Sequence, residues 1–402
     1  MKELIESIDI PHRLNESLMR IDDVALKSKE LGYYTYFPQV RSACGRDMTL
    51  IDGRKMLNFA SCDYLGLSNH ERMKESAIAA IRKYGSNIGG PMIFSGFTEY
   101  HERLQQSYSD LYAGRTSLMF TTSYQANFGV IPLAAERADL ILLDKLSHVS
   151  IWDGVKLSGC PFRAYSHADI EMLEQLVQLN QDKKILIITD GVFSADGDIA
   201  DLGRIVRLKR FHPGLEIYID DAHGVGMLGG SGQGACEAAG VVSEIDYIVG
   251  TMSKAFGSSG GFVVFKDEAF AERVRFRCPT YNASRSVSPG VASASCTALE
   301  INASEGGARR AQLAELTRYT HEQIESLGVD KLHSRTAVIP VVFKDPMEAA
   351  RVNAELVGKG IMGSLFVPPF VPNHQSRIRL CLTYNHTMAD VDYCIDSLRK
   401  II

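Results

Sequence analysis

Lys254 and Asp220 are the two residues of this sequence best placed to do chemistry. Lys254 follows Ser253 and precedes other small residues, a setting in which a carbonyl compound could approach the amine. Partial burial lowers the pKa of a lysine, so that its amine can act as a nucleophile and form a Schiff base. Asp220 directly follows the apolar run Leu215–Ile219, and an unpaired carboxylate is costly to bury. The aspartate therefore needs a cation, which a protonated pyridine nitrogen would supply.

Polar residues also follow four other apolar runs. These positions matter because ligands of open α/β proteins bind beyond the carboxyl ends of the strands. Ser123 and Tyr124 open a predicted helix, whose first backbone N–H groups would form a phosphate site or an ordinary helix cap. A single residue of this kind is more often a surface-loop residue, but five such segments converge. They are Thr121–Gln125, Asp144–His148, Thr189–Ser194, Asp220–His223 and Thr251–Lys254. The combination indicates pyridoxal 5'-phosphate (PLP) as the cofactor.

A glycine-rich segment offers a competing interpretation. Gly224–Gly229 matches the G-x-G-x-x-G pattern that follows a strand in dinucleotide-binding proteins. More glycines, among them Gly230, Gly232 and Gly234, stand where the phosphate-binding helix should begin. Each glycine costs a helix about 1 kcal/mol. The segment is therefore better interpreted as a flexible turn than as a nicotinamide site.

Short apolar runs rich in branched residues predict the buried strands that would position these residues. Amphipathic segments such as Ile170–Val177 lie between the first four runs, which predicts βαβ units in a largely parallel sheet. The last two runs are joined by a turn too short for a crossover, which leaves room for an antiparallel strand. The runs are Ser117–Phe120, Leu140–Leu143, Ile185–Ile188, Leu215–Ile219, Tyr247–Val249 and Phe262–Phe265.

The pattern changes towards both ends of the chain. Apolar residues at helical spacing from Leu14 to Ala25 stop at Gly32 and predict an amphipathic helix. After about residue 300 the sequence predicts charged helices, a strand over Ala337–Phe343 and a last amphipathic helix. We expect an N-terminal helical arm over residues 1–50, a large α/β domain over 51–300 and a smaller α+β domain over 301–402.

Composition excludes several classes of function. The 402 residues include 43 basic and 48 acidic ones, and a net charge of −5 argues against a nucleic-acid partner. No apolar run approaches the roughly 18 residues that span a bilayer, and the first residues lack the apolar core of a signal peptide. Eight cysteines without a C-x-x-C pair predict neither a metal site nor a disulfide framework. We expect a cytoplasmic enzyme without a metal.

Six segments, in this order, make the chain resemble the α-oxoamine synthase family of fold-type I PLP enzymes. The family includes aminolevulinate synthase, amino-oxononanoate synthase, aminoketobutyrate ligase and serine palmitoyltransferase. The resemblance implies a PLP-dependent acyltransferase that is a homodimer, with a mostly parallel central sheet, helices on both of its faces and a smaller C-terminal domain. The segments are Asn58–Leu67, Ser147–Ser150, Asp190–Ser194, Asp220–His223, Thr251–Lys254 and Ser376–Leu380.

The resemblance also implies roles for single residues around the PLP ring. Lys254 would form the Schiff base and later act as acid and base at the substrate Cα. Asp220 would keep the pyridine nitrogen protonated. His148 would stack on one face of the ring and Ala222 would allow close approach on the other. His223 and the hydroxyl of Ser194 would hydrogen-bond the phenolic oxygen of the ring.

The remaining site residues would hold the phosphate and the amino acid. Ser123, Tyr124 and Thr251 would hold the phosphate. Ser253, next to Lys254, would be a further cofactor-binding residue. Arg379 would pair with the amino-acid carboxylate through the bidentate fork of its guanidinium. Arg377 is the alternative partner for this carboxylate. It could instead be a surface arginine on a strand. Cys62 stands near the substrate, where the family usually has asparagine, which leaves the choice of substrate open.

The implied reaction condenses an amino acid with an acyl thioester, on coenzyme A or an acyl-carrier protein, and releases CO₂ and an α-aminoketone. Further departures from the family are Phe370, Asp190 in place of glutamate, and a longer Tyr281–Pro289 segment. They favour a specialised or signalling pathway. The amino acid, the acyl length and the product are not readable from the sequence. An aminotransferase, an amino-acid decarboxylase and a non-catalytic partner subunit are the alternatives, although the retained Lys254 argues against the last.

Overall fold

The computed structural model describes residues 19–402, so the start of the expected N-terminal helix lies outside the described residues. The chain divides into two compact units. The larger unit comprises Leu65–Phe193 and Ile199–Arg310. The smaller unit comprises the described residues up to Tyr64, the short segment Ser194–Asp198, and Ala311–Ile402. No helix among the described residues has both the length and the apolar content needed to cross a bilayer.

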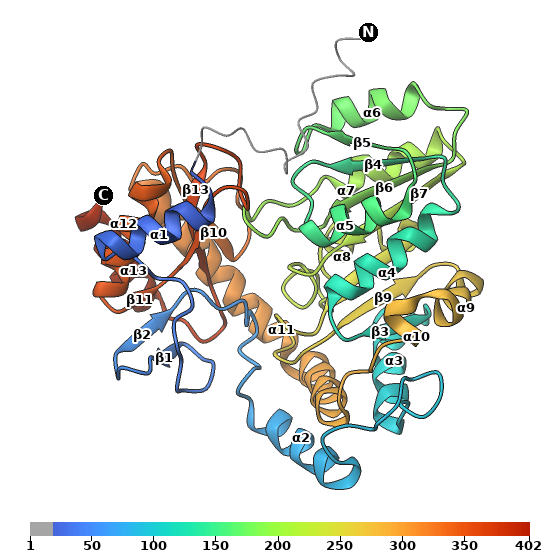
Figure 1. Ribbon diagram of the computed structural model, residues 1–402, viewed down its shortest axis with the longest axis horizontal. Coiled ribbons are helices and arrows are strands. Elements are labelled where there is room, and N and C mark those ends of the chain that lie inside the picture. The colour runs from blue at the N-terminus through green and yellow to red at the C-terminus, as the bar shows by residue number, and fades with distance from the viewer. Residues whose placement is uncertain (1–18) are drawn as a thin grey trace. The chain divides into compact units, whose positions relative to one another are not determined.

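The larger unit is built on a seven-stranded sheet in the order β3-β9-β8-β7-β6-β4-β5 (Figure 1). Strands β4 to β8 run parallel, and β9 lies antiparallel between β3 and β8. Continuous apolar runs form these strands because most of them are covered on both faces. Their bounds are β3 Ser117–Phe120, β4 Leu140–Asp144, β5 Phe162–Tyr165, β6 Ile185–Asp190, β7 Leu215–Asp220, β8 Tyr247–Thr251 and β9 Gly261–Phe265.

Two helices of this unit begin at residues of chemical interest. Helix α4 (Ser123–Ala135) packs against β3, β8 and β9, and the Thr122 side chain caps its N-terminus. Helix α5 (Val149–Ser158) packs on α4 and has His148 as its N-cap. The other helices are α2 Glu71–Tyr84, α3 Glu99–Leu111, α6 Ile170–Gln178, α7 Leu202–Arg207, α8 Ala235–Ala238, α9 Glu268–Arg277 and α10 Pro279–Asn282. Helix α11 (Pro289–Ser326) supplies residues to both units.

The described residues of the smaller unit form two three-stranded sheets. In one, β13 (Ser376–Cys381) lies between β10 (Val338–Phe343) and β12 (Ser364–Phe366), antiparallel to both. In the other, β2 (Lys55–Asn58) lies between β1 (Asp47–Thr49) and β11 (Ile361–Met362). Among the described residues, the helices that lie wholly within this unit are α1 Ile21–Leu31, α12 Pro346–Gly358 and α13 Met388–Ile401.

The fold class expected from the sequence is confirmed, since the central sheet is mostly parallel and a smaller sheet-containing unit is present. All six apolar runs form strands, and the last lies antiparallel as expected. Strand β5 went unrecognised because Arg163 interrupts its short apolar pattern at the edge of the sheet. Residue 300 lies inside the continuous helix α11, so no break in secondary structure marks the expected boundary there.

Truncating the core of the sheet should destabilise the larger unit. Ile187 lies in the middle of β6 and has no exposed surface. We expect Ile187→Ala to lower the free energy of unfolding by about 2–5 kcal/mol, because burial is lost and a cavity remains. The control is Leu179→Ala, whose side chain is 76% exposed and which should change stability by less than about 0.5 kcal/mol. Equal effects in chemical denaturation would contradict the described core.

Candidate functional site

Three neighbouring parallel strands of the larger unit each end on a buried aspartate. Asp144 ends β4, Asp190 ends β6 and Asp220 ends β7, and none is more than 5% exposed. Asp190 and Asp220 stand opposite each other in the register of β6 and β7. Burial and the neighbouring Asp220 raise the pKa of Asp190 well above its usual range. Asp190 is thereby biased towards its neutral form, and this edge of the sheet attracts a cation.

Asn127 on α4 is the centre of a buried hydrogen-bond network around Asp220. Its amide nitrogen donates to Asp220 Oδ2 at 2.5 Å and to Ser150 Oγ at 2.9 Å. Its amide oxygen accepts from the Tyr218 hydroxyl at 2.9 Å. The other Asp220 oxygen accepts the backbone N–H of Ala222 at 3.0 Å. These neutral donors orient the carboxylate but do not neutralise its charge.

His148 is held in a neutral form at the start of α5. Its backbone N–H donates to Asp190 Oδ2 at 2.9 Å. Ring atom Nδ1 accepts the backbone N–H of Ser150 at 3.3 Å and lies 2.7 Å from Ser150 Oγ. Burial lowers the pKa of His148, although Asp220 acts in the opposite direction, and Lys254 lowers it further. The imidazole of His148 is therefore biased towards its neutral form and lies within electrostatic range of both Asp220 and Lys254.

Donor groups from α4 and β8 gather around Gly261. A Cβ added at Gly261 would lie 2.3 Å from the backbone nitrogen of Ser123, at the N-terminus of α4. Gly261 is also paired with Thr251, whose hydroxyl lies 2.7 Å from that of Ser253. The N-terminus of a 13-residue helix attracts anions through its first N–H groups and its dipole, although Thr122 already caps the N–H of Gln125. This part of the unit fits a phosphate group, with Tyr124 next to Ser123 and 39% exposed.

Lys254 lies in the short connection between β8 and β9 and is partly buried. Gly257 lies in that connection with φ at +59°. A Cβ added at Gly257 would lie 2.4 Å from the backbone nitrogen of Ser68. The loop therefore requires glycine. Ala222 and His223 follow β7 and are 7% and 6% exposed. The unit thus brings Lys254, Asp220 and His148 together at one edge of its sheet.

The glycine-rich segment after His223 already has an anion of its own. One Glu237 oxygen accepts the backbone N–H of Ser231 at 2.9 Å, and the other accepts those of Gly232 and Gln233 at 3.1 and 2.9 Å. The guanidinium of Arg310 donates to the carbonyl of Gly230 at 2.8 Å. The turn wraps a carboxylate of the chain itself, which counts against the nicotinamide interpretation.

Arg379 lies on the central strand β13 of the smaller unit and is 9% exposed. Nη1 donates to the carbonyl of Ser194 at 2.8 Å, and the guanidinium lies 4.7 Å from the centre of the Phe366 ring. Within the described chain, buried Nε has no hydrogen-bond partner. Nη2 contacts Cys62 Sγ at 3.6 Å. A guanidinium held in this way, with an unmet donor, suits an anionic ligand such as a carboxylate.

Arg377, the alternative partner for a substrate, is engaged elsewhere in the same unit. It has no exposed surface, and its Nη1 donates to Asp196 Oδ1 at 2.5 Å. Nε donates to the carbonyl of Gln375 at 3.0 Å. A buried arginine paired with a carboxylate is a structural element, and removing either partner would leave a charge uncompensated. Arg379 is thus the arginine of β13 that can serve a ligand.

Phe370 and the arginines of α9 do not belong to the clusters around Lys254 and Arg379. Phe370 is 62% exposed. The basic residues of α9 are paired with acids: Arg273 and Arg277 with Glu136, and Arg275 with Glu272. The positive charge of these arginines is therefore compensated by neighbouring carboxylates.

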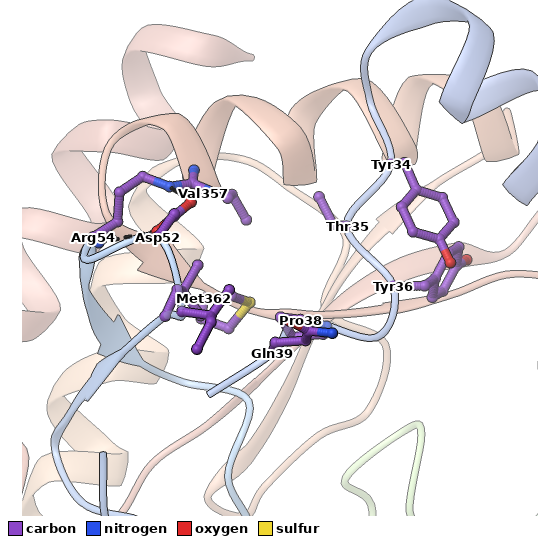
Figure 2. Close-up of a pocket in the computed structure, with 11 residues that line it drawn as sticks. Tyr34, Thr35, Tyr36, Pro38, Gln39, Asp52, Arg54, Val357 and Met362 are labelled. Atoms are coloured by element: carbon purple, nitrogen blue, oxygen red, sulfur yellow. Dashed lines mark hydrogen bonds and ion pairs between the residues drawn. The ribbon is translucent and has the colours of Figure 1, made fainter. Parts of the chain in front are cut away.

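A separate cavity of about 140 Å³ lies in the smaller unit. Figure 2 shows Tyr34 and Tyr36 at one end of it and the ion pair between Arg54 and Asp52 at the other. Met362 and Val357 also line it. The cavity shares no residue with the clusters around Lys254 or Arg379.

Asn127 was missed by sequence reasoning. It lies within the predicted helix after Phe120, and its only signal is that it is polar while the helix residues after it are apolar or small. The partners of such a residue come from other strands and helices, so the pattern cannot name them.

Comparisons with known proteins identify the family to which this chain is similar. The family model described as aminotransferase class I and II matches residues 54–398. The chain is 35% identical to the 8-amino-7-oxononanoate synthase of Thermoanaerobacter pseudethanolicus, over 96% of this chain and 98% of that protein. It is 37% identical to the enzyme of that name from Marinobacter nauticus, over 87% and 88%. Among solved structures, the Sphingomonas wittichii serine palmitoyltransferase superposes with a TM-score of 0.88 at 27% identity, covering 94% and 96%. A serine palmitoyltransferase from S. paucimobilis that holds PLP also gives 0.88, at 26% identity, covering 94% and 95%.

Removing the Asn127 amide should cost more than the loss of one hydrogen bond. Asn127→Ala leaves the Tyr218 hydroxyl, Ser150 Oγ and Asp220 Oδ2 without this partner. We expect the free energy of unfolding to fall by about 1–3 kcal/mol, the cost of unmet buried polar groups. Asn282→Ala is the matched control, because it removes one hydrogen bond near the surface. A loss at Asn127 no greater than at Asn282 would contradict the network.

Proposed function

The chain belongs to the α-oxoamine synthase family within the class I and II aminotransferases, and we propose that it joins an amino acid to an acyl thioester with loss of CO₂. It is a PLP-dependent acyltransferase. The names of its relatives describe this chemistry. The name 8-amino-7-oxononanoate places an amino group and a ketone on adjacent carbons. The name serine palmitoyltransferase pairs an amino acid with an acyl group.

The residues of the larger unit fit PLP. The observation that carries the proposal is the convergence of Asp220, His148 and Lys254 at one edge of the sheet. Asp220 is buried, oriented by Asn127 and in need of a cation, which the pyridinium nitrogen would provide. The N-terminus of α4 and the Thr251 hydroxyl fit the phosphate. Lys254 supplies the amine for the aldehyde.

PLP, when bound, supplies an electron sink that stabilises negative charge at the substrate Cα. In our proposal Asp220 would keep the ring nitrogen protonated, and the imidazole of His148 would help to hold the ring. Lys254 would hold the cofactor through its Nζ. It would also accept and return the proton at the substrate Cα. His223, Ala222, Ser253 and the other expected contacts belong to this proposal.

The amino-acid carboxylate is the ligand that we propose for Arg379. The Nε of this arginine lacks a partner among the described residues, and Nη1 is anchored by the Ser194 carbonyl. A carboxylate held at a fixed angle restricts the orientation of the bonds at the amino-acid Cα. Arg379 would therefore influence both the binding and the orientation of the amino acid. Cys62, in contact with Arg379, borders the same ligand.

The curated relatives named above do not support the expected specialised or signalling pathway, because they carry the name of one biosynthetic enzyme. We propose that alanine and serine are the first amino acids to test. Alanine without its carboxyl carbon would leave the two terminal carbons of 8-amino-7-oxononanoate, and serine is in the name of the structural relatives. An acyl-carrier protein as donor, a homodimer and a cytoplasmic location remain predictions.

The reaction itself is the first test. The purified enzyme with PLP is given an amino acid and acyl-CoA thioesters of increasing length, and free thiol and CO₂ are measured. We expect both to appear in equal amounts and only when both substrates are present. CO₂ without a thioester would indicate a decarboxylase, and transfer of the amino group to an oxo acid would indicate an aminotransferase. Either result would contradict the proposal.

Replacing Lys254 should abolish the covalent link to PLP. Borohydride reduction of wild-type enzyme should fix the cofactor to one tryptic peptide that contains Lys254, whereas Lys254→Ala should give no such adduct. We expect kcat to fall by at least about 100-fold, because the acid-base group is lost. Lys266→Ala, at an exposed lysine just after β9, should behave like wild type. An undiminished adduct in Lys254→Ala would contradict the assignment.

Replacing Arg379 should weaken amino-acid binding selectively. Arg379→Lys keeps the positive charge but loses the two-pronged geometry. We expect KM for the amino acid to rise about 10- to 100-fold, the effect of one charged hydrogen bond, with KM for the thioester changed little. Arg399→Lys, at an exposed position on α13, is the control. An unchanged amino-acid KM in Arg379→Lys would show that another group holds the carboxylate.

A further inference from the structure

Two cysteine thiols of the smaller unit lie in contact beside Arg379. The sulfur atoms of Cys62 and Cys381 are 3.8 Å apart, and the structure records both as thiols. Two backbone hydrogen bonds tie their segments together. The N–H of Cys381 donates to the carbonyl of Phe59 at 2.7 Å, and that of Tyr384 donates to the carbonyl of Tyr64 at 2.8 Å. The segments on both sides of the pair are therefore fixed alongside each other.

The two thiols differ in access and in electrostatic environment. Cys62 is partly exposed, whereas Cys381 is buried. Arg379 Nη2 lies 3.6 Å from the Cys62 sulfur, and a neighbouring cation favours negative charge on sulfur. The contact with Cys62 and burial raise the pKa of Cys381 well above its usual range. An oxidant would thus react first at Cys62, with Cys381 held as the second thiol.

We propose that Cys62 and Cys381 form an oxidation site at which hydrogen peroxide produces a disulfide. The Cys62 thiolate attacks one peroxide oxygen, hydroxide leaves, and a sulfenic acid forms. The Cys381 sulfur then displaces the hydroxyl group of that sulfenic acid, and the S–S bond forms. Two thiols are oxidised, one peroxide is reduced, and both thiol protons end in two molecules of water.

The geometry demands little movement. A disulfide needs the sulfur atoms at about 2.05 Å, so the pair must close by roughly 1.8 Å, which rotation of two side chains on anchored segments can supply. Cys44 is a useful contrast. It is exposed, and its sulfur lies 3.4 Å from the hydroxyl of Ser61 rather than beside another thiol.

Formation of the bond would change the surroundings of Arg379. The Cys62 sulfur would move towards Cys381 and become a weak acceptor in a neutral disulfide, so Nη2 would lose its present contact. This consequence rests on the proposed function, in which Arg379 binds the amino-acid carboxylate. Oxidation would then weaken amino-acid binding, and a dithiol reductant would restore it. The formation of the disulfide does not depend on that function.

Peptide mapping tests the site directly. The PLP-loaded enzyme is treated with a few equivalents of hydrogen peroxide, remaining thiols are blocked, and tandem mass spectrometry identifies linked tryptic peptides. We expect a link between Cys62 and Cys381 in wild type and in Cys44→Ser, and none in Cys381→Ser. Dithiothreitol should remove it. Failure of wild type to form this link, or a link to a different cysteine instead, would overturn the proposal.

Kinetics test the consequence. The oxidised enzyme should show an amino-acid KM about fivefold higher, the effect of losing one weak hydrogen bond, and dithiothreitol should reverse the change. Cys44→Ser should respond to peroxide like wild type, and Cys381→Ser should not respond reversibly. A mapped disulfide with an unchanged KM would overturn the regulatory consequence. If the enzyme condensed no amino acid with a thioester, the proposed function would fail, while the mapping would still decide the oxidation site.

Discussion

The burial of carboxylates at the ends of neighbouring parallel strands is the constraint on which the rest of the structure depends. Asp190 and Asp220 stand side by side in the register of β6 and β7, and both are almost fully buried. Two negative charges that are buried next to each other are unfavourable. One carboxyl is therefore biased towards its neutral form, and the other requires a cation. The Asn127 network fixes the orientation of Asp220 but leaves this requirement unmet. In the proposed function, a cofactor with a protonated ring nitrogen would satisfy it.

The sequence allowed most of the sheet to be predicted, because strands covered on both faces require unbroken apolar runs. The run from Ile185 to Ile188 is an example, and its strand extends only two residues further. Strand β5 was not predictable in this way, since an edge strand tolerates a charged residue such as Arg163. The described residues up to Tyr64 form one unit with the C-terminal segment through contacts that link distant parts of the chain, which local periodicity does not reveal.

Side-chain partners were less predictable than strands. Arg377 and Arg379 are two residues apart on β13, so alternation places them on the same face and cannot tell them apart. Asp196, which comes from a distant segment, makes one of them structural. Similarly, Gly224–Gly229 matches a nucleotide-binding pattern, and only the structure shows that Glu237 occupies the turn that follows. Such distinctions depend on residues that the fold brings together from far apart in sequence.

The protonation state of the cofactor ring is the most direct test of the role of Asp220. Enzyme loaded with PLP that carries ¹⁵N in the ring would be followed by NMR across the pH range in which the protein is folded. We expect a ring nitrogen that stays protonated well above its pKa in water, and that loses this proton in Asp220→Asn. A ring nitrogen that is unprotonated in wild type, or unaffected by Asp220→Asn, would contradict the central role given to the buried carboxylate.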